Sequence, residues 1–232
     1  MTTTHIRTDH LIVTAAERED PRLAADRLVD AIRHVVMDSP VVVNGVQGTL
    51  SNDGIATILH VENATVDNIV VPLHIAASRF RRTKAVDFIA EITRQVRFDK
   101  QNVFHAATAF GITPEAHPGK LLAASAYSYA GYISWLCLNA SQSAFALLVY
   151  LDYSLAHEAC AALVPALRRR PGTPPEIVSY FGLYEERPTE VLDAAIDIVR
   201  DGLAHGEDLQ EAIDAVSMAE PYLGAFWRLS RG

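Results

Sequence analysis

Apolar residues recur at helical spacing along most of the chain. The first clear stretch runs from Pro21 to Met37, where Leu28, Ile32 and Val35 follow one another at steps of four and three residues. This spacing puts the three residues on one face of a helix, and proline is well suited to a first helical turn. The pattern predicts a helix over about residues 21–37, preceded by a flexible leader over residues 1–20.

Glycine, proline and capping residues divide the remainder of the chain into further helical segments. Ser51 offers a cap for the next helix, Pro72 is expected to bend that helix, and Gly111 is a typical signal for the end of another. With no repeat and no linker, the chain is predicted to be all-α, a single-domain helical bundle over residues 21–232. Further helices are expected over about residues 53–82, 83–110, 120–138, 142–169, 174–184, 188–204 and 207–229.

No charged residue occurs from Leu121 to Leu151, which raises the question of a membrane span. The polar run Asn139–Ser143 divides this stretch into two shorter pieces. Each piece is too short and too polar to cross the roughly 30 Å of a bilayer's hydrocarbon core. Helices that are apolar on all sides are usually buried inside a protein, so we expect two central helices and no membrane partner.

The composition limits which binding partners and which cellular compartment are expected. The chain has 232 residues, half of them hydrophobic, and a net charge of −8. This charge argues against nonspecific nucleic-acid binding, because such binding needs lysines and arginines to displace phosphate counterions. Cys137 and Cys160 lie in apolar helical stretches, and the first residues show no secretory signal. We therefore expect a cytoplasmic protein with buried, reduced thiols.

Three segments, in their order along the chain, resemble the TenA family. Ser39–Ser51 resembles an early family segment in which His-Pro-Phe leads to Gly-Thr-Leu ahead of a long helix. Phe104–Ile112 is similar to the end of the family's third long helix, and Ala225–Trp227 to its closing Phe-Trp. TenA proteins share one helical fold with PqqC-type oxidases and heme-oxygenase-like diiron oxidases. The resemblance, over about residues 39–229, implies a heme-oxygenase-like bundle and is compatible with a homo-oligomer.

The segment 180–191 looks like the one that carries His-x3-Asp-x2-His in iron-dependent members of this superfamily. The three positions that carry metal ligands in those proteins are occupied here by Tyr184, Pro188 and Val191. Proline and valine cannot bind a metal. The diiron oxidases also have a glutamate about ten residues before a histidine. His105 matches that histidine, but the position of the glutamate is occupied by Gln95. The neutral amide of Gln95 lacks the charge that holds a hard cation. These departures lead us to expect no metal and no other cofactor.

The TenA thiaminases hydrolyse an aminopyrimidine with an aspartate, a cysteine nucleophile and a C-terminal glutamate. The position of the family aspartate corresponds to the neighbourhood of Glu62, so a carboxylate is kept there. The position of the family cysteine corresponds to the neighbourhood of Tyr150, where no thiol is present. The glutamate place holds Leu223, with Glu220 one helical turn earlier. The resemblance implies that a divergent hydrolase of this type would use Glu62 and Glu220 without a thiol nucleophile.

Tyrosines gather in the stretches predicted as central helices. Tyr129 and Tyr132 share a helix face by their spacing of three residues, and so do Tyr150 and Tyr153. Converging hydroxyl groups form a pocket for a polar aromatic or heterocyclic ligand. Together with Tyr184, these residues are therefore the candidates for substrate binding. The alternative is that most of them are core residues with satisfied hydroxyl groups.

Glu62, His105 and Glu220 are the candidate catalytic residues. Glu62 is expected to face inward because Ile58 and Val66 mark the apolar stripe of its helix, and a buried carboxylate needs a partner or changes its pKa. His105 is expected on an inward face, where a pKa near neutrality suits proton transfer. The alternatives are an exposed carboxylate at Glu62 and a hydrogen-bonded core histidine at His105.

Other ionisable residues give weaker evidence for a catalytic or metal-binding site. Asp152 and His157 are five residues apart, which is poor for one helix face. Asp193, Asp197 and Asp201 recur every four residues, and like charges at this spacing favour a solvated surface. The sequence shows no glycine-rich phosphate loop, no nucleophile elbow and no zinc-ligand spacing.

Three functions stay open at this point. The first is a metal-free enzyme of cofactor or secondary metabolism, an oxidase or a hydrolase, with Glu62 and His105 as acid and base. The second is a ligand-binding or partner protein without catalysis. The third is a divergent TenA-type hydrolase that uses Glu62 and Glu220. All three take a small-molecule ligand as the partner.

Overall fold

The computed structural model describes residues 11–112 and 124–228, and every regular element in these ranges is a helix. The predicted all-α class is confirmed. The elements are α1 (Ala15–Glu19), α2 (Pro21–Met37), α3 (Pro40–Val46), α4 (Asn52–Thr65), the 3-10 helix η1 (Val66–Ile69), α5 (Val70–Phe80), α6 (Thr83–Thr108), α7 (Ala124–Asn139), α8 (Gln142–Arg169), α9 (Pro175–Gly182), α10 (Thr189–Ala204), α11 (Leu209–Ser217) and α12 (Ala219–Trp227).

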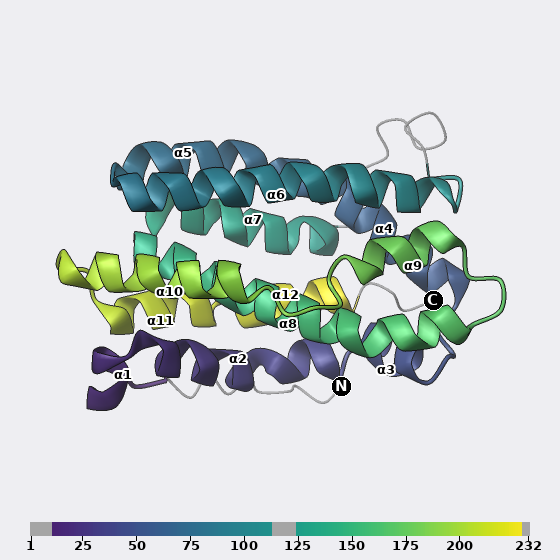
Figure 1. The fold of residues 1–232 in the computed structure, drawn as a ribbon, viewed down its shortest axis with the longest axis horizontal. Coiled ribbons are helices and arrows are strands. Elements are labelled where there is room, and N and C mark those ends of the chain that lie inside the picture. Colours follow the sequence, from purple (N-terminus) through teal and green to yellow (C-terminus); the bar gives the residue numbers. More distant parts are fainter. Residues whose placement is uncertain (1–10, 113–123, 229–232) are drawn as a thin grey trace.

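The helices lie in layers along the long axis of the molecule (Figure 1). Helices α5, α6 and α7 form one side, α2 and α3 form the opposite side, and α8, α10, α11 and α12 lie between them. Helix α8 contacts α2, α3, α9, α10 and α11. By length and composition α8 would suit a membrane span, but most of its apolar stretch is buried against the other helices. Helix α8 is thus the centre of one continuous hydrophobic core.

The first turn of α8 is held by a carboxylate from the turn between α10 and α11. The Glu207 carboxylate accepts hydrogen bonds from the backbone N–H groups of Gln142, at 3.2 Å, and Ser143, at 2.9 Å. The Ser141 side chain caps a third N–H group, that of Ala144. These acceptors satisfy amides that have no partner inside the helix, so α8 begins at the predicted residue.

Two predicted helices are broken in the structure. The helix predicted over 53–82 divides into α4, η1 and α5, and the one predicted over 207–229 divides into α11 and α12. Pro72 lies in the first turn of α5 and Pro221 in the first turn of α12. Proline has no N–H group to donate to the carbonyl four residues earlier, and its ring clashes with that carbonyl, so each proline lies where a new helix begins instead of bending one.

Helix α3 occupies a valine-rich stretch for which the sequence pattern predicts no helix. The Ser39 side chain accepts a hydrogen bond from the Val42 N–H group, and Pro40 takes the first helical position. Val41 and Val42 are buried, and α3 packs on α8. The cap and the burial of one valine face outweigh the low intrinsic helix propensity of valine.

The second half of the predicted leader contains the short helix α1. Thr14 and Glu17 form a reciprocal capping box at the start of α1, and Val13 is buried. The Gln210 side chain accepts a hydrogen bond from the Val13 N–H group at 2.7 Å. A local cap and an apolar anchor therefore hold this part of the chain on α11, whereas residues 1–10 lie outside the described part of the structure.

Candidate functional site

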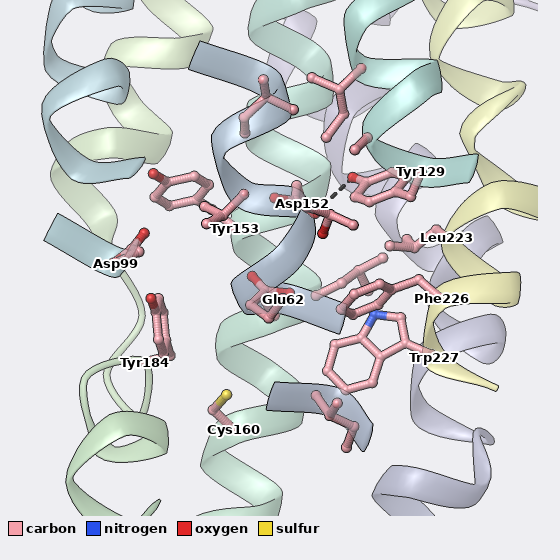
Figure 2. Close-up of a pocket in the computed structure, with 18 of the residues that line it drawn as sticks. Glu62, Asp99, Tyr129, Asp152, Tyr153, Cys160, Tyr184, Leu223, Phe226 and Trp227 are labelled. Atoms are coloured by element: carbon pink, nitrogen blue, oxygen red, sulfur yellow. Dashed lines mark hydrogen bonds between the residues drawn. The ribbon is translucent and has the colours of Figure 1, made fainter. Parts of the chain in front are cut away.

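A partly open cavity of about 180 Å³ lies among α4, η1, α6, α7, α8, α9 and α12. Its walls are mainly apolar and aromatic, which is typical of small-molecule sites. Aromatic rings line it from four helices and from the segment between α9 and α10 (Figure 2). These rings belong to Tyr129, Tyr153, Tyr180, Phe181, Tyr184, Phe226 and Trp227.

Helix α8 presents a broad face to the cavity. The lining residues of α8 are Asp152, Tyr153, Leu155, Ala156, His157 and Cys160. Asp152 and His157 both line the cavity although their five-residue spacing is poor for one helix face, because the lining residues cover a broad arc of α8. The steps from Tyr153 to Ala156 and from His157 to Cys160 are each one helical turn.

Three carboxyl groups from three different helices meet at this cavity. Glu62 comes from α4, Asp99 from α6 and Asp152 from α8. Asp152 accepts a hydrogen bond from the Tyr129 hydroxyl group at 2.7 Å. Asp99 accepts one from the Gln95 amide at 2.9 Å and another from the Tyr184 hydroxyl group. Figure 2 shows Asp99 on the Tyr184 side of the cavity and Asp152 on the Tyr129 side.

Glu62 differs from the two aspartates because it has no neutralising or donating partner. Its carboxyl group faces the cavity, and no described residue forms a hydrogen bond or ion pair with it. Burial raises the pKa of Glu62 from its ordinary value of 4.5 to about 8, and the charges of Asp152 and Asp99 act in the same direction. Glu62 thus carries a proton at neutral pH and can lose it within the physiological range.

Burial also raises the pKa of Asp99 and Asp152, but hydrogen bonds oppose that rise. Burial raises the pKa of Asp99, and the hydrogen bonds from Tyr184 and Gln95 oppose that rise. Burial also raises the pKa of Asp152, where the Tyr129 hydroxyl group opposes the rise and the charge of Asp99 adds to it. A donated hydrogen bond favours the charged form of a carboxyl group, so Glu62 is the group that most readily takes up a proton.

The only thiol of the cavity among the described residues is Cys160. Burial raises the pKa of Cys160 to about 12, and the charge of Glu62 contributes. A thiol must lose its proton to act as a nucleophile. Cys160 therefore does not replace the nucleophilic cysteine that the TenA resemblance associates with a place near Tyr150. Both cysteines, Cys137 and Cys160, are buried and free, as predicted.

Gln95 and Tyr184, two places that the resemblance associates with metal ligands, meet at Asp99. The amide of Gln95 and the hydroxyl group of Tyr184 both donate to this carboxylate. Within residues 11–112 and 124–228, no group of three or more histidine, cysteine or acidic side chains is arranged to hold a metal ion. The Asp99 and Asp152 carboxylates thus accept hydrogen bonds from tyrosines, and the donor set among the described residues does not fit the iron site of the oxidases.

Two of the predicted catalytic residues lie away from the cavity. His105 is exposed, because the inward face of α6 at this level is formed by Val103, Ala106 and Ala107, which are fully buried. The Glu220 Oε1 atom lies 3.5 Å from the His34 Nε2 atom of α2, away from the cavity. The cavity wall there is formed by Leu223 instead. The structure does not bring His105 or Glu220 to Glu62.

The predicted substrate-binding tyrosines divide into two groups. Tyr129, Tyr153 and Tyr184 line the cavity. The Tyr132 hydroxyl group instead donates to the Ala215 carbonyl at 2.6 Å, and the Tyr150 hydroxyl group donates to Asp26 at 2.5 Å. Tyr132 and Tyr150 are thus core residues with satisfied hydroxyl groups, the alternative left open by the sequence.

Sequence reasoning did not place Asp99, Asp152 or Cys160 at the candidate site. A signal exists for Asp152, because it is the first charged residue after the long uncharged stretch and lies between Leu151 and Tyr153. Asp99 has no comparable signal, since it stands among the charged residues Arg97 and Lys100.

Comparison with solved structures identifies the fold. A TenA homologue from Pseudomonas syringae pv. tomato aligns with a TM-score of 0.74 at 12% identity, over 88% of this chain and 90% of that one. A TenA homologue from Pyrococcus furiosus gives 0.74 at 14% identity, over 90% and 98%. A domain of unknown function with a heme oxygenase-like fold, from Shewanella denitrificans, gives 0.70 at 10% identity, over 91% and 90%.

The predicted heme-oxygenase-like fold is confirmed by these alignments. No protein-family model matches the sequence, and the search of curated proteins finds no match. At identities of 10–14% the likeness concerns the fold, because one fold hosts many functions. The function must therefore be argued from the cavity itself.

Proposed function

We propose that this heme-oxygenase-like protein is an enzyme that binds a small organic nitrogen cation in its central cavity, and that Glu62 exchanges a proton with the bound molecule. The observation that carries the proposal is the unpartnered Glu62 carboxyl group, which faces a cavity shared with two hydrogen-bonded aspartates.

The charge of the cavity supports a cationic ligand. Three carboxyl groups line it, and no lysine or arginine is among its described lining residues. Buried negative charge is costly without a positive counterpart. A bound cation supplies that counterpart, whereas a bound anion would be repelled by each ionised carboxyl group.

The aromatic wall supports a planar ligand. The rings of Tyr129 and Phe226 lie 6.4 Å apart, and those of Phe226 and Trp227 lie 5.9 Å apart. Aromatic faces attract organic cations, most strongly where water is excluded. A flat heterocycle or amidine therefore suits the space between these rings and Glu62, in agreement with the aromatic or heterocyclic ligand expected from the sequence.

Proton transfer is the chemistry that Glu62 supports best. A general acid or base works most efficiently when its pKa is close to the working pH, and burial raises the pKa of Glu62 to about 8. Hydrolysis is the simplest reaction of this kind: ionised Glu62 takes a proton from water, the water oxygen bonds to the substrate carbon, and the proton passes to the departing nitrogen. This route needs no thiolate, which accords with the protonated Cys160.

A second candidate is a binding protein that does not transform its ligand. The observation that favours it is the high pKa of Cys160, about 12, which leaves the cavity without a thiol nucleophile. The cavity would then select the same class of cation, and the absence of turnover would be the difference.

The test compares benzamidine, a planar cation, with benzamide, its neutral counterpart, by calorimetry. We expect benzamidine to bind and benzamide to bind at least about tenfold more weakly, as one charged contact implies. Because the cation prefers ionised Glu62, its affinity should rise roughly tenfold from pH 7 to pH 9. Equal binding of the two compounds would refute the proposal.

The matched variants are Glu62→Gln and Glu220→Gln. Glu62→Gln should weaken benzamidine binding at pH 9 and remove its pH dependence, whereas Glu220→Gln, which lies outside the cavity lining, should change neither. For any nitrogen heterocycle that the protein turns over, Glu62→Gln should lower kcat by about a hundredfold or more. Turnover that survives Glu62→Gln and disappears in Glu220→Gln would restore the hydrolase hypothesis based on Glu220.

A further inference from the structure

One carboxyl oxygen of Asp152 is free for a ligand. Asp152 lies in the middle of α8 and lines the cavity. Its Oδ1 atom accepts the hydrogen bond from the Tyr129 hydroxyl group at 2.7 Å. Its Oδ2 atom has no hydrogen-bond partner among the described residues, and it is not one of their buried unpartnered atoms. The Oδ2 atom is therefore accessible, and a carboxylate oxygen is a strong acceptor.

The accessible side of Asp152 opens on the cavity and not on the outer surface. One helical turn away on either side, Leu148 and Leu155 are 3% and 1% exposed, and Ala156 lines the cavity together with Asp152. Figure 2 shows Asp152 and Glu62 in the central part of the cavity. After burial, the charge of Asp152 is the largest cause of the raised pKa of Glu62. A ligand beside Glu62 is thus also beside Asp152.

Asp152 keeps a negative charge where Glu62 is protonated. Burial raises the pKa of Asp152, and the hydrogen bond from Tyr129 opposes that rise by favouring the charged form. Glu62 has no such donor, so the first proton goes to Glu62. No described lysine or arginine lines the cavity or acts on Asp152. A buried charge of this kind is costly unless a cation pairs with it.

Asp99 is less suited to pair with a cation. Its carboxylate already accepts hydrogen bonds from Gln95, at 2.9 Å, and from Tyr184. Asp152 accepts one described hydrogen bond, and Figure 2 shows it on the Tyr129 side of the cavity, away from Asp99. The unused acceptor therefore belongs to Asp152.

We infer that Asp152 anchors the ligand, with its Oδ2 atom paired to the positive nitrogen group while Glu62 exchanges the proton. The inference rests on the proposed function and assigns the ion pair within it. The aromatic wall begins at the same place, because the ring of Tyr129 lies 6.4 Å from that of Phe226. The ligand class narrows to planar cations that are strongly basic, such as amidinium and guanidinium compounds, because these stay positive where Glu62 is protonated.

The first experiment measures benzamidine binding to Asp152→Asn by calorimetry. Asparagine keeps an oxygen that accepts from Tyr129 and loses only the charge. We expect the affinity to fall at least about tenfold at both pH 7 and pH 9, as the loss of one charged contact implies. The rise in affinity between pH 7 and pH 9 should persist, because Glu62 is intact. Glu62→Gln should show the opposite pattern, with nearly wild-type affinity at pH 7 and no rise at pH 9.

Asp87→Asn is the matched control. It removes one negative charge at an exposed position of α6, outside the cavity lining. A distant surface charge is screened by salt, so the benzamidine affinity should change less than about twofold. Asp99→Asn tests the other hydrogen-bonded aspartate of the cavity, and we expect a smaller loss of affinity there than in Asp152→Asn.

A second measurement needs no variant. Calorimetry of the wild-type protein at pH 6, in two buffers that differ in their enthalpy of ionisation, gives the number of protons released for each benzamidine bound. A cation that pairs with the already charged Asp152 should release fewer than about half a proton. A cation that depends on Glu62 alone should release about one, because Glu62 must first lose its proton.

The outcomes separate the inference from the proposed function. Wild-type affinity in Asp152→Asn, a larger loss in Asp99→Asn than in Asp152→Asn, or the release of about one proton at pH 6 would refute the anchoring role of Asp152 and leave the cation site intact. If Asp152→Asn does not fold, the proton count decides. Failure of wild-type protein to bind benzamidine would refute both.

Discussion

The Tyr129 hydroxyl group donates to the Asp152 carboxylate at 2.7 Å and so joins α7 to α8 across the wall of the cavity. Tyr129 also lies beside Phe226 of α12. The same side chain therefore orients a carboxyl group of the candidate site and forms part of its aromatic wall.

Tyr129→Phe should separate these two roles, because the ring stays and the donor is lost. We expect a loss of about 1–2 kcal/mol in the free energy of unfolding, since Asp152 is left without its hydrogen bond. Urea unfolding at pH 7 measures this loss. Tyr222→Phe, at a partly exposed tyrosine with no described hydroxyl bond, is the control. Equal stabilities of the two variants would contradict the importance of the Tyr129–Asp152 bond.

The stability of the protein should fall as the pH rises from about 4.5 to about 8. In this window folded Glu62 keeps a proton that the unfolded chain has released, because its pKa is raised from 4.5 to about 8. Asp99 and Asp152, whose pKa values are also raised, act in the same direction.

Glu62→Gln should flatten this pH dependence and make the protein more stable than the wild type at pH 8. The difference corresponds to about 1.4 kcal/mol for each pKa unit that separates the folded and unfolded states. Urea unfolding at pH 5, 6, 7 and 8 measures it, with Glu220→Gln as the control. Parallel curves for wild type and Glu62→Gln would show that Glu62 is not buried in the folded protein.

Gly202→Ala should destabilise the fold where α8 begins. A Cβ atom at Gly202 would lie 2.2 Å from Ser143 Oγ and 2.3 Å from Glu207 Oε2, so the Glu207 carboxylate would have to leave the α8 amides. We expect a cost of about 1–3 kcal/mol.

Gly131→Ala is the matched control for that substitution. It lies within α7, and nothing approaches its Cβ position within 4 Å. Alanine is the better helix former there, so a gain of about 0.5–1 kcal/mol is expected. Thermal unfolding of both variants decides the matter: a Gly202→Ala protein as stable as Gly131→Ala would mean that the Glu207 cap is dispensable.

Alkylation of the native protein by iodoacetamide should be slow at pH 8. Cys137 and Cys160 are buried, and burial raises the pKa of each thiol to about 12, so little thiolate is present. Mass spectrometry should show both thiols unmodified in the native state and modified after denaturation. Rapid selective labelling of Cys160 would instead point to an activated nucleophile in the cavity.

The sequence predicts the helices well where local signals act alone. The bounds of α2 and α8 agree with the prediction because proline or serine marks the start and apolar spacing runs unbroken. It fails where proline falls inside a long apolar stretch, as at Pro72, because the choice between a kink and a restart depends on what the next turn packs against. In α5, that packing is on α6 and α7.

The candidate site was predictable only in part, for a similar reason. Glu62 lies in the apolar stripe of a short helix, so its inward direction follows from its neighbours. His105 lies near the end of α6, a helix of 26 residues, along which the buried face shifts relative to any fixed spacing. The partners of Tyr132 and Tyr150 are 83 and 124 residues away in the chain, and no local pattern reveals them.

The Glu207 cap makes the central helix dependent on residues that the ribosome adds much later. The two bonds to the start of α8 span 65 and 64 residues. During synthesis, α8 emerges with its first amides unsatisfied, and they find their carboxylate only after α9, α10 and the following turn have been made. The order of synthesis therefore opposes early completion of the core helix, so the last third of the chain sets when the bundle closes.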